Sequence, residues 1–324
     1  MTRSREEAAM RGELPMPERI DERTWCLPLP IDFPNGSVRF TLCYVLEDAE
    51  RGIHLIDPGA DSEDNVRILT DFLTDIGRDR GSVRSCIVTH LHLDHLGMAH
   101  RLRDHGAATV MGAREARQLK ENVAFPDEGA LARWGVPDKS RGELRARVSQ
   151  SSMRAADIHV DVRVEEGDVL PIPGREVVVV DTPGHTAGHV CLVEEGSGLF
   201  FSGDHVLPIV NPGIGHWVGD GENPLDCYLD SLRKTVRYDH LVVSPGHGYR
   251  FTGLAERSAQ IAEHHEARTR AVARAMRDRP ADSVWGTAQR IPWTAGLSTL
   301  VGPRLVAALA QTEMHMTRVR AGSH

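Results

Sequence analysis

The sequence has few cysteines, no long apolar run and no excess of positive charge. Its 324 residues include five cysteines, none of them spaced as Cys-x-x-Cys. Cysteines that lie inside apolar segments are typical of buried thiols in a reducing compartment. No segment is long enough to span a membrane, and residues 1–20 lack the apolar region of a secretory signal. We therefore expect a cytoplasmic protein that does not associate with membranes.

Charge and length exclude further classes. A formal net charge of -8 disfavours broad nucleic-acid binding, although it leaves room for a local basic surface. A hydrophobic content of 40% and a charged content of 26% are those of an ordinary globular protein. The length suits one large domain with an appendage or two modest domains, and no repeat of solenoid length is present.

Apolar patterning divides the chain into three predicted parts. Residues 1–22 are polar and are predicted to form a mobile arm. In residues 23–253, short β-branched runs that end at Gly, Pro or Asp alternate with helical segments, one of them capped by Ser62 and ending near Ile76. This alternation, in two successive halves, favours an α/β sandwich with two sheets over a doubly wound sheet.

Two segments differ from this pattern. Residues 121–156 have scattered charges and weak periodicity, which predicts an inserted helical or irregular segment. It could serve as a lid or as a homodimer surface, or it could be a long loop without a role of its own. Residues 254–324 are rich in Arg and Ala, with ten Arg against six Asp and Glu. They are predicted to form a small helical C-terminal domain that contacts substrate or a second subunit.

The most informative motif is His90-Leu91-His92-Leu93-Asp94-His95, which directly follows the apolar run Cys86-Ile87-Val88. Alternate side chains of an extended segment share one face, so His90 and His92 can bind one cation. Asp94 and His95 lie beyond it and can reach a second cation. Chance clustering of four metal-binding side chains beside a strand is improbable, so the motif predicts a metal site.

Three further motifs place a histidine or aspartate where an apolar run ends. His185 ends Asp181-Thr182-Pro183-Gly184-His185, Asp204 ends Ser202-Gly203-Asp204, and His247 ends Ser244-Pro245-Gly246-His247. Loops at strand ends can direct ligands from a rigid sheet into one cleft. The adjacent glycine allows a close backbone approach or a positive φ. Each motif is weak alone, but together they predict one shared site.

These motifs, with Asp57 before them, resemble those of the metallo-β-lactamase superfamily over residues 38–250. The resemblance implies an αββα sandwich that holds two metal ions. His90, His92 and His185 would bind the first, Asp94, His95 and His247 the second, and Asp204 would bridge them. Such nitrogen and oxygen donors suit two Zn²⁺ ions per chain, and Fe or Mn also accepts them. The absence of a cysteine ligand argues against the antibiotic-degrading branch.

Residues around the ligands have predicted supporting roles. Asp57 is expected to accept the free ring N–H of a ligating histidine, or else to cap its own turn. His189 is expected to be structural, and His205 to point away from Asp204. Ile209, His216 and Trp217, in a segment rich in Pro and Gly, are candidate walls of the substrate pocket.

The resemblance implies hydrolysis in which a hydroxide held between the two metals attacks the substrate, with Asp94 orienting this nucleophile or receiving its proton. The C-terminal region resembles a glyoxalase II-like branch with a helical or winged-helix-like tail. The leading hypothesis is a hydrolase of small-molecule esters, thioesters or lactones. One alternative is a phosphodiesterase or endoribonuclease that uses the Arg-rich tail. Another is a mononuclear iron oxygenase of thiols or persulfides, which the presence of both Asp94 and His247 disfavours.

Overall fold

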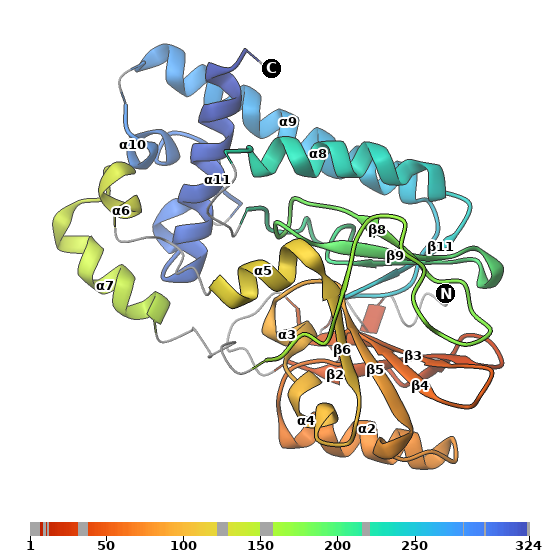
Figure 1. Ribbon diagram of the computed structural model, residues 1–324. Coiled ribbons are helices and arrows are strands. Elements are labelled where there is room, and N and C mark those ends of the chain that lie inside the picture. Colours follow the sequence, from red (N-terminus) through yellow and green to blue (C-terminus); the bar gives the residue numbers. More distant parts are fainter. Residues whose placement is uncertain are drawn as a thin grey trace.

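Two β-sheets pack face to face, and helices cover both outer faces (Figure 1). The computed structural model describes residues 7–8, 11, 13–31, 38–121, 129–149, 158–215, 221–280, 282–294 and 296–322. Helices α2 (Glu63–Asp75) and α4 (Ala99–Arg103) lie on the outer face of one sheet, and α8 (Pro224–Thr235) and α9 (Leu254–Asp278) lie on that of the other. The predicted αββα sandwich is confirmed.

The first sheet contains seven strands in chain order. Strands β1 to β4 are antiparallel to their neighbours, whereas β4 to β7 run parallel. The strands are β1 (Glu18–Arg19), β2 (Thr24–Pro30), β3 (Phe40–Glu47), β4 (Ile53–Ile56), β5 (Val83–Val88), β6 (Ala108–Gly112) and β7 (Val162–Val164).

The second sheet has four strands in the order β11-β10-β9-β8. They are β8 (Val178–Asp181), β9 (Val190–Glu194), β10 (Leu199–Gly203) and β11 (Val242–Pro245). Only β10 and β11 pair in parallel, and their register shifts between Phe201 and Gly203. This irregularity comes directly before Asp204, where a bulge redirects the chain out of the sheet.

The remaining helices are α3 (Leu93–Leu96), α5 (Ala113–Glu121), α6 (Ala130–Arg133), α7 (Asp138–Ser149), α10 (Val284–Ala288) and α11 (Pro303–Arg320). As predicted, Ser62 caps α2, because its hydroxyl accepts the backbone N–H of Asn65 at 3.1 Å. Within the described ranges, no helix has both the length and the apolar content needed to cross a bilayer. From residue 254 on, the described chain is helical without strands, so it does not contain the strands of a winged helix there.

Three apolar clusters hold the layers together. In β5, Cys86 and Val88 face the helices on the outer side, while Ile87 faces the second sheet, as the alternation of a strand requires. Between the sheets, the rings of Tyr44 and Phe201 meet edge to face with their centroids 5.1 Å apart. The sheets are therefore joined rigidly beneath the edge where the predicted ligands lie.

The C-terminal helices have no core of their own. Val272 of α9 and Leu309 of α11 belong to the same buried cluster as Leu232 of α8 and Trp134, which follows α6 in the predicted insertion. The backbone N–H of Trp285 also donates to the carbonyl of Trp134 at 2.8 Å. The predicted boundary at residue 253 is thus not a break in packing, and the insertion and the tail complete one helical layer.

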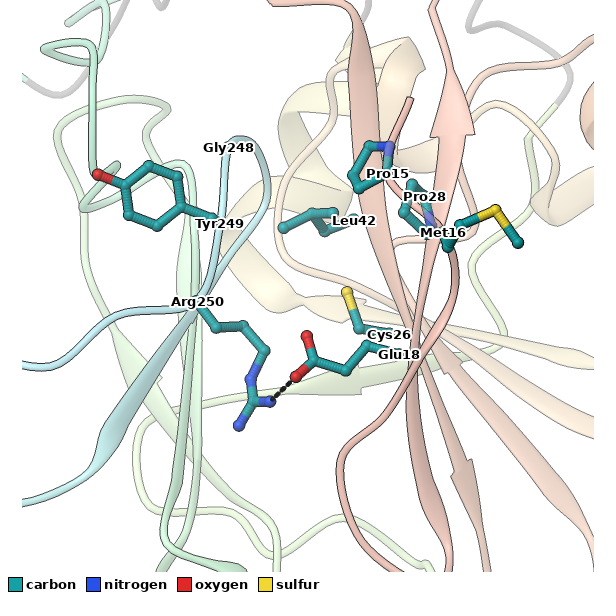
Figure 2. A pocket seen from close by; sticks show the side chains of 9 residues that line it. All are labelled: Pro15, Met16, Glu18, Cys26, Pro28, Leu42, Gly248, Tyr249 and Arg250. Carbon is teal, nitrogen blue, oxygen red and sulfur yellow. Dashed lines mark hydrogen bonds and ion pairs between the residues drawn. The ribbon is translucent and has the colours of Figure 1, made fainter. Parts of the chain in front are cut away.

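Part of the predicted mobile arm lies in the first sheet. Glu18 pairs with Cys26 across β1 and β2, and its carboxylate accepts from Arg250 at 3.3 Å. Figure 2 shows this ion pair beside a small pocket between β1, β2 and the loop that follows β11. Met16 lies at the edge of that pocket. The prediction of a mobile arm extending to residue 22 is therefore wrong at its inner end.

Candidate metal centre

The predicted ligands converge at one edge of the two sheets because each follows a strand. His90 comes two residues after β5, and His92 is still extended, with φ -66° and ψ 140°. Helix α3 begins at Leu93 and carries Asp94 and His95 in its single turn. The change from strand to helix inside the motif turns its two halves in different directions, which separates the two pairs of ligands.

The first group joins three histidines and one carboxylate. The Nε2 atoms of His90 and His185 each lie 3.0 Å from Nδ1 of His92. Oδ2 of Asp204 lies 3.6 Å from Nε2 of His185. All four side chains can direct one ligand atom at a common point.

The second group lies on the other side of Asp204. Nε2 of His95 and Nε2 of His247 are 3.2 Å apart, and Oδ2 of Asp94 is 3.4 Å from Nε2 of His247. Oδ1 of Asp204 is 3.4 Å from Nε2 of His247 and 3.6 Å from Nε2 of His95. The two oxygens of Asp204 thus face different groups, as the bridging arrangement requires.

The protonation pattern of the rings suits divalent cations. The outer Nδ1 atoms of His185 and His247 lie 2.7 and 2.8 Å from the carbonyls of Gly213 and Phe40. A carbonyl only accepts, so each Nδ1 carries a proton, and Nε2 is the atom that presents a lone pair once the ring is neutral. Oδ1 of Asp204 is also buried without a hydrogen-bond partner. Facing lone pairs and an unsatisfied carboxylate oxygen are stabilised by a cation between them.

Without a cation, protons compensate the charge of the carboxylates. Burial opposes ionisation of Asp204, yet His247 and His95 outweigh it and hold the pKa of Asp204 well below its usual value. Burial likewise opposes protonation of His247, but Asp204 and Asp94 raise the pKa of His247 well above its usual value. Metal binding at this group therefore has to displace a proton.

Asp57 contacts the outer ring nitrogen of one predicted ligand and, instead of capping its own turn, a turn that is distant in the sequence. Its Oδ2 lies 2.8 Å from Nδ1 of His95, and the backbone N–H and hydroxyl of Thr89 donate to the same carboxylate at 2.8 Å each. Its φ of 55° is in the left-handed region, which is unfavourable for a residue other than glycine. The carboxylate thereby fixes the ring of His95 and the turn leading to His90.

His189, which directly precedes β9, supports Asp204. Its Nδ1 lies 2.7 Å from the hydroxyl of Thr182, and its Nε2 accepts the backbone N–H of Asp204 at 3.1 Å. Gly203 has φ 47°, and a Cβ there would lie only 2.8 Å from Nε2 of His189. The ring of His205 instead lies 3.1 Å from the hydroxyl of Thr235, away from the carboxylate of Asp204, as predicted.

Glu115, on α5, joins two of the ligand loops, and the sequence analysis missed it. Its fully buried carboxylate accepts the backbone N–H of Leu91 at 2.7 Å and that of Gly188 at 2.8 Å, with one oxygen for each. Burial raises the pKa of Glu115, while these hydrogen bonds oppose the rise. One side chain thus holds the His90–His92 turn against the loop that carries His185.

Replacing Glu115 by glutamine tests this role. An amide retains one acceptor oxygen, so the side chain can keep its hydrogen bond to only one of the two loops. We therefore expect metal affinity to fall by about 10- to 100-fold, the usual effect of losing a contact that supports metal ligands. Competition with a chromophoric chelator measures the affinity. Glu121→Gln changes an exposed residue of the same helix and should leave affinity unchanged. Equal affinities in both variants would show that Glu115 does not position the ligands.

The predicted substrate residues are only partly described. Ile209 is exposed, at 42%, and its segment is anchored by Arg257, whose guanidinium donates to the carbonyls of Leu207 at 2.7 Å and Val210 at 2.9 Å. His216 and Trp217 lie outside the described residues.

Comparison with known proteins agrees with this geometry. The model of the family described as "Metallo-beta-lactamase superfamily" matches residues 36–247, which include all the proposed ligands. The chain belongs to this superfamily. It is 28% identical over 269 residues to the Bacillus subtilis protein named "Probable metallo-hydrolase YqjP", covering 78% of this chain and 80% of that one. It is 25% identical over 220 residues to "Hydroxyacylglutathione hydrolase GloC" of Haemophilus influenzae, covering 67% and 90%.

Solved structures of the superfamily extend the likeness to the helical layer. A metallo-beta-lactamase family protein from Thermus thermophilus has a TM-score of 0.75 at 24% identity, covering 94% of this chain and 95% of its own. A beta-lactamase domain protein from Burkholderia ambifaria has a TM-score of 0.76 at 25% identity, covering 94% and 89%. The hydrolase relatives and the His and Asp cluster support a metal-dependent hydrolase.

Proposed function

We propose that this protein hydrolyses an ester, thioester or lactone bond of a small molecule at a dinuclear metal centre. The observation that carries the proposal is the division of Asp204, whose Oδ2 faces His185 while its Oδ1 faces His95 and His247. Each side also has its own set of converging donor atoms. A site for one ion would leave one of these sets without a purpose.

The residues of the chain would share the work as follows. His90, His92 and His185 would hold one ion, Asp94, His95 and His247 would hold the other, and Asp204 would contribute to both. Divalent ions of this kind lower the pKa of a water to about 7 and polarise a carbonyl oxygen. Asp94 lies at the opening of the centre, with its side chain 15% exposed, whereas that of His95 is fully buried. Its carboxylate can therefore orient the attacking water and receive a proton.

Zinc is the proposed metal, because the donors are imidazole nitrogens and carboxylate oxygens without a thiolate. A carbonyl substrate agrees with the name of the Haemophilus influenzae relative, a hydroxyacylglutathione hydrolase. A nuclease would need free cationic side chains on the tail, yet several of its arginines form ion pairs, such as Arg270 with Glu263 and Arg318 with Glu266. The proposed substrate is therefore a small molecule.

Metal analysis combined with a substrate panel tests the proposal. We expect about two zinc ions per chain in protein purified without added metal, and turnover of a thioester or lactone but not of RNA. One iron per chain with oxygen consumption would instead indicate the oxygenase. RNA cleavage that weakens steeply with salt would indicate the nuclease, because phosphate contacts release counterions.

A further inference from the structure

Helix α9 carries an arginine, Arg268, that has no role in the hydrolysis proposed above. The guanidinium carbon of Arg268 lies 4.3 Å from the ring centroid of Trp293, which covers one face of the group. Nε and Nη1 of Arg268 are both buried, and neither has a hydrogen-bond partner. The guanidinium group has five N–H donors in a fixed planar arrangement and stays positively charged at every physiological pH. Arg268 as a whole is half-buried, and its two buried nitrogens lose their hydration unless an acceptor, most favourably an anion, takes its place.

The nearby carboxylates in the described chain are engaged elsewhere. Arg270 binds Glu263, and Arg318 binds both Glu266 and Asp226. Burial lowers the pKa of Arg268, and no carboxylate contributes an opposing effect. Among the residues that the structure describes, no carboxylate therefore neutralises the charge of Arg268.

Further donors without acceptors surround Arg268. His265, three residues earlier on α9, is 2% exposed, and neither of its ring nitrogens has a hydrogen-bond partner. Its ring stacks on that of His315 of α11, with the centroids 6.1 Å apart. A neutral imidazole still carries one N–H. The interface of α9 and α11 thus offers donors from two side chains to an acceptor that the described protein does not supply.

The same region is joined to the metal centre. Arg257, which holds the segment that follows Asp204, precedes Arg268 by eleven residues, so the two share a helix face about 16 Å apart along the axis. Tyr228 connects the layers, since its hydroxyl donates to the carbonyl of His205 at 2.7 Å and its ring meets that of His265 at 5.7 Å. A substrate of several bonds' length is needed to span such a separation.

We propose that Arg268, stacked on Trp293, binds an anionic group of the substrate, a carboxylate or a phosphate, at a distance from the bond that is hydrolysed. This inference rests on the proposed function and narrows it to anionic substrates. The planar fork suits either anion in a bidentate contact, and His265 supplies a further donor.

Anion binding is tested first without turnover. The melting temperature of the zinc-loaded protein is followed while inorganic phosphate or succinate is added, for the wild type, Arg268→Met and the matched control Arg270→Met. We expect both anions to stabilise the wild type and Arg270→Met, with an affinity at least about tenfold lower in Arg268→Met. Without anion, Arg268→Met should be at least as stable as the wild type, because it removes an uncompensated charge. Equal anion effects in all three proteins would place the anion elsewhere, for instance at the metals, and overturn the proposal.

A pair of esters then tests substrate recognition. The anionic probe is the mono-4-nitrophenyl ester of hexadecanedioic acid, whose chain is long enough to span this separation. For this ester, Arg268→Met should raise KM at least about tenfold with kcat unchanged, and Arg268→Lys should lie between. For 4-nitrophenyl palmitate, a neutral ester of the same chain length, KM should be unchanged. An equal loss on both esters would show a structural role for Arg268. If neither these esters nor the thioesters and lactones of the panel are hydrolysed, the proposed function fails, while the anion titration still decides whether Arg268 binds anions.

Discussion

Replacing Asp204 by asparagine is expected to lower kcat/KM by more than about 100-fold. Losing a residue that only supports a metal ligand costs up to about 100-fold, and Asp204 is itself a proposed ligand, so its loss should cost more. The asparagine side chain would keep one acceptor oxygen, so it could face either His185 or the pair formed by His95 and His247, but not both as the carboxylate does. We therefore also expect the bound metal to fall from two ions to about one. Emission spectrometry on gel-filtered protein measures the metal, and thioester or lactone turnover measures the activity.

A surface variant separates this effect from a general loss of an aspartate. Asp230→Asn alters an exposed carboxylate whose partner is Arg233 on α8, and it should keep both the metals and the activity. The melting temperature of each variant shows whether it folds. If Asp204→Asn retains two metals and full turnover, the bridging role is wrong.

The His and Asp residues that converge at the strand ends could be singled out from the sequence because their signal is local. His90, Asp204 and His247 each stand a short turn after an apolar run, and the motif around each can be recognised from adjacent residues. The two-sheet architecture follows from the same alternation of short runs and helices. Such predictions need only the periodicity of strands and the preference of metals for His and Asp.

The supporting residues could not be predicted, because their partners are distant in sequence. Glu115 accepts hydrogen bonds from the backbone of Leu91 and Gly188, which are 24 and 73 positions away in the sequence. Because any residue type can supply a backbone N–H, such contacts leave no recognisable pattern in the sequence. His189 has motif neighbours, but only the structure shows that its ring accepts from Asp204. The C-terminal helices looked like an appendage because their apolar faces cannot reveal which surface they cover, and here it is the core shared with α8.

Removing the metal ions is expected to abolish hydrolysis and to destabilise the folded protein. The stripped centre would hold buried imidazoles and carboxylates together without the ions that join them, with Nε2 of His95 and His247 only 3.2 Å apart. Ligands present at a thousand times their Kd contribute about 4 kcal/mol to stability, so we expect the melting temperature to fall by on the order of 10 °C. Calorimetry before and after dialysis against a chelator measures this fall, and added Zn²⁺ should restore both properties.

Metal binding is expected to weaken as the pH falls. Because Asp204 and Asp94 raise the pKa of His247 in the metal-free protein, binding must release a proton there, and affinity should weaken as pH falls. The number of protons released is measured by calorimetric titration of the metal in buffers of different ionisation enthalpy. His240 also has a raised pKa, through its hydrogen bond to Glu195 on the surface, so His240→Ala is the control and should leave proton release unchanged. A chelated sample that hydrolyses its substrate at the full rate would contradict the metal-dependent mechanism itself, whatever its thermal stability.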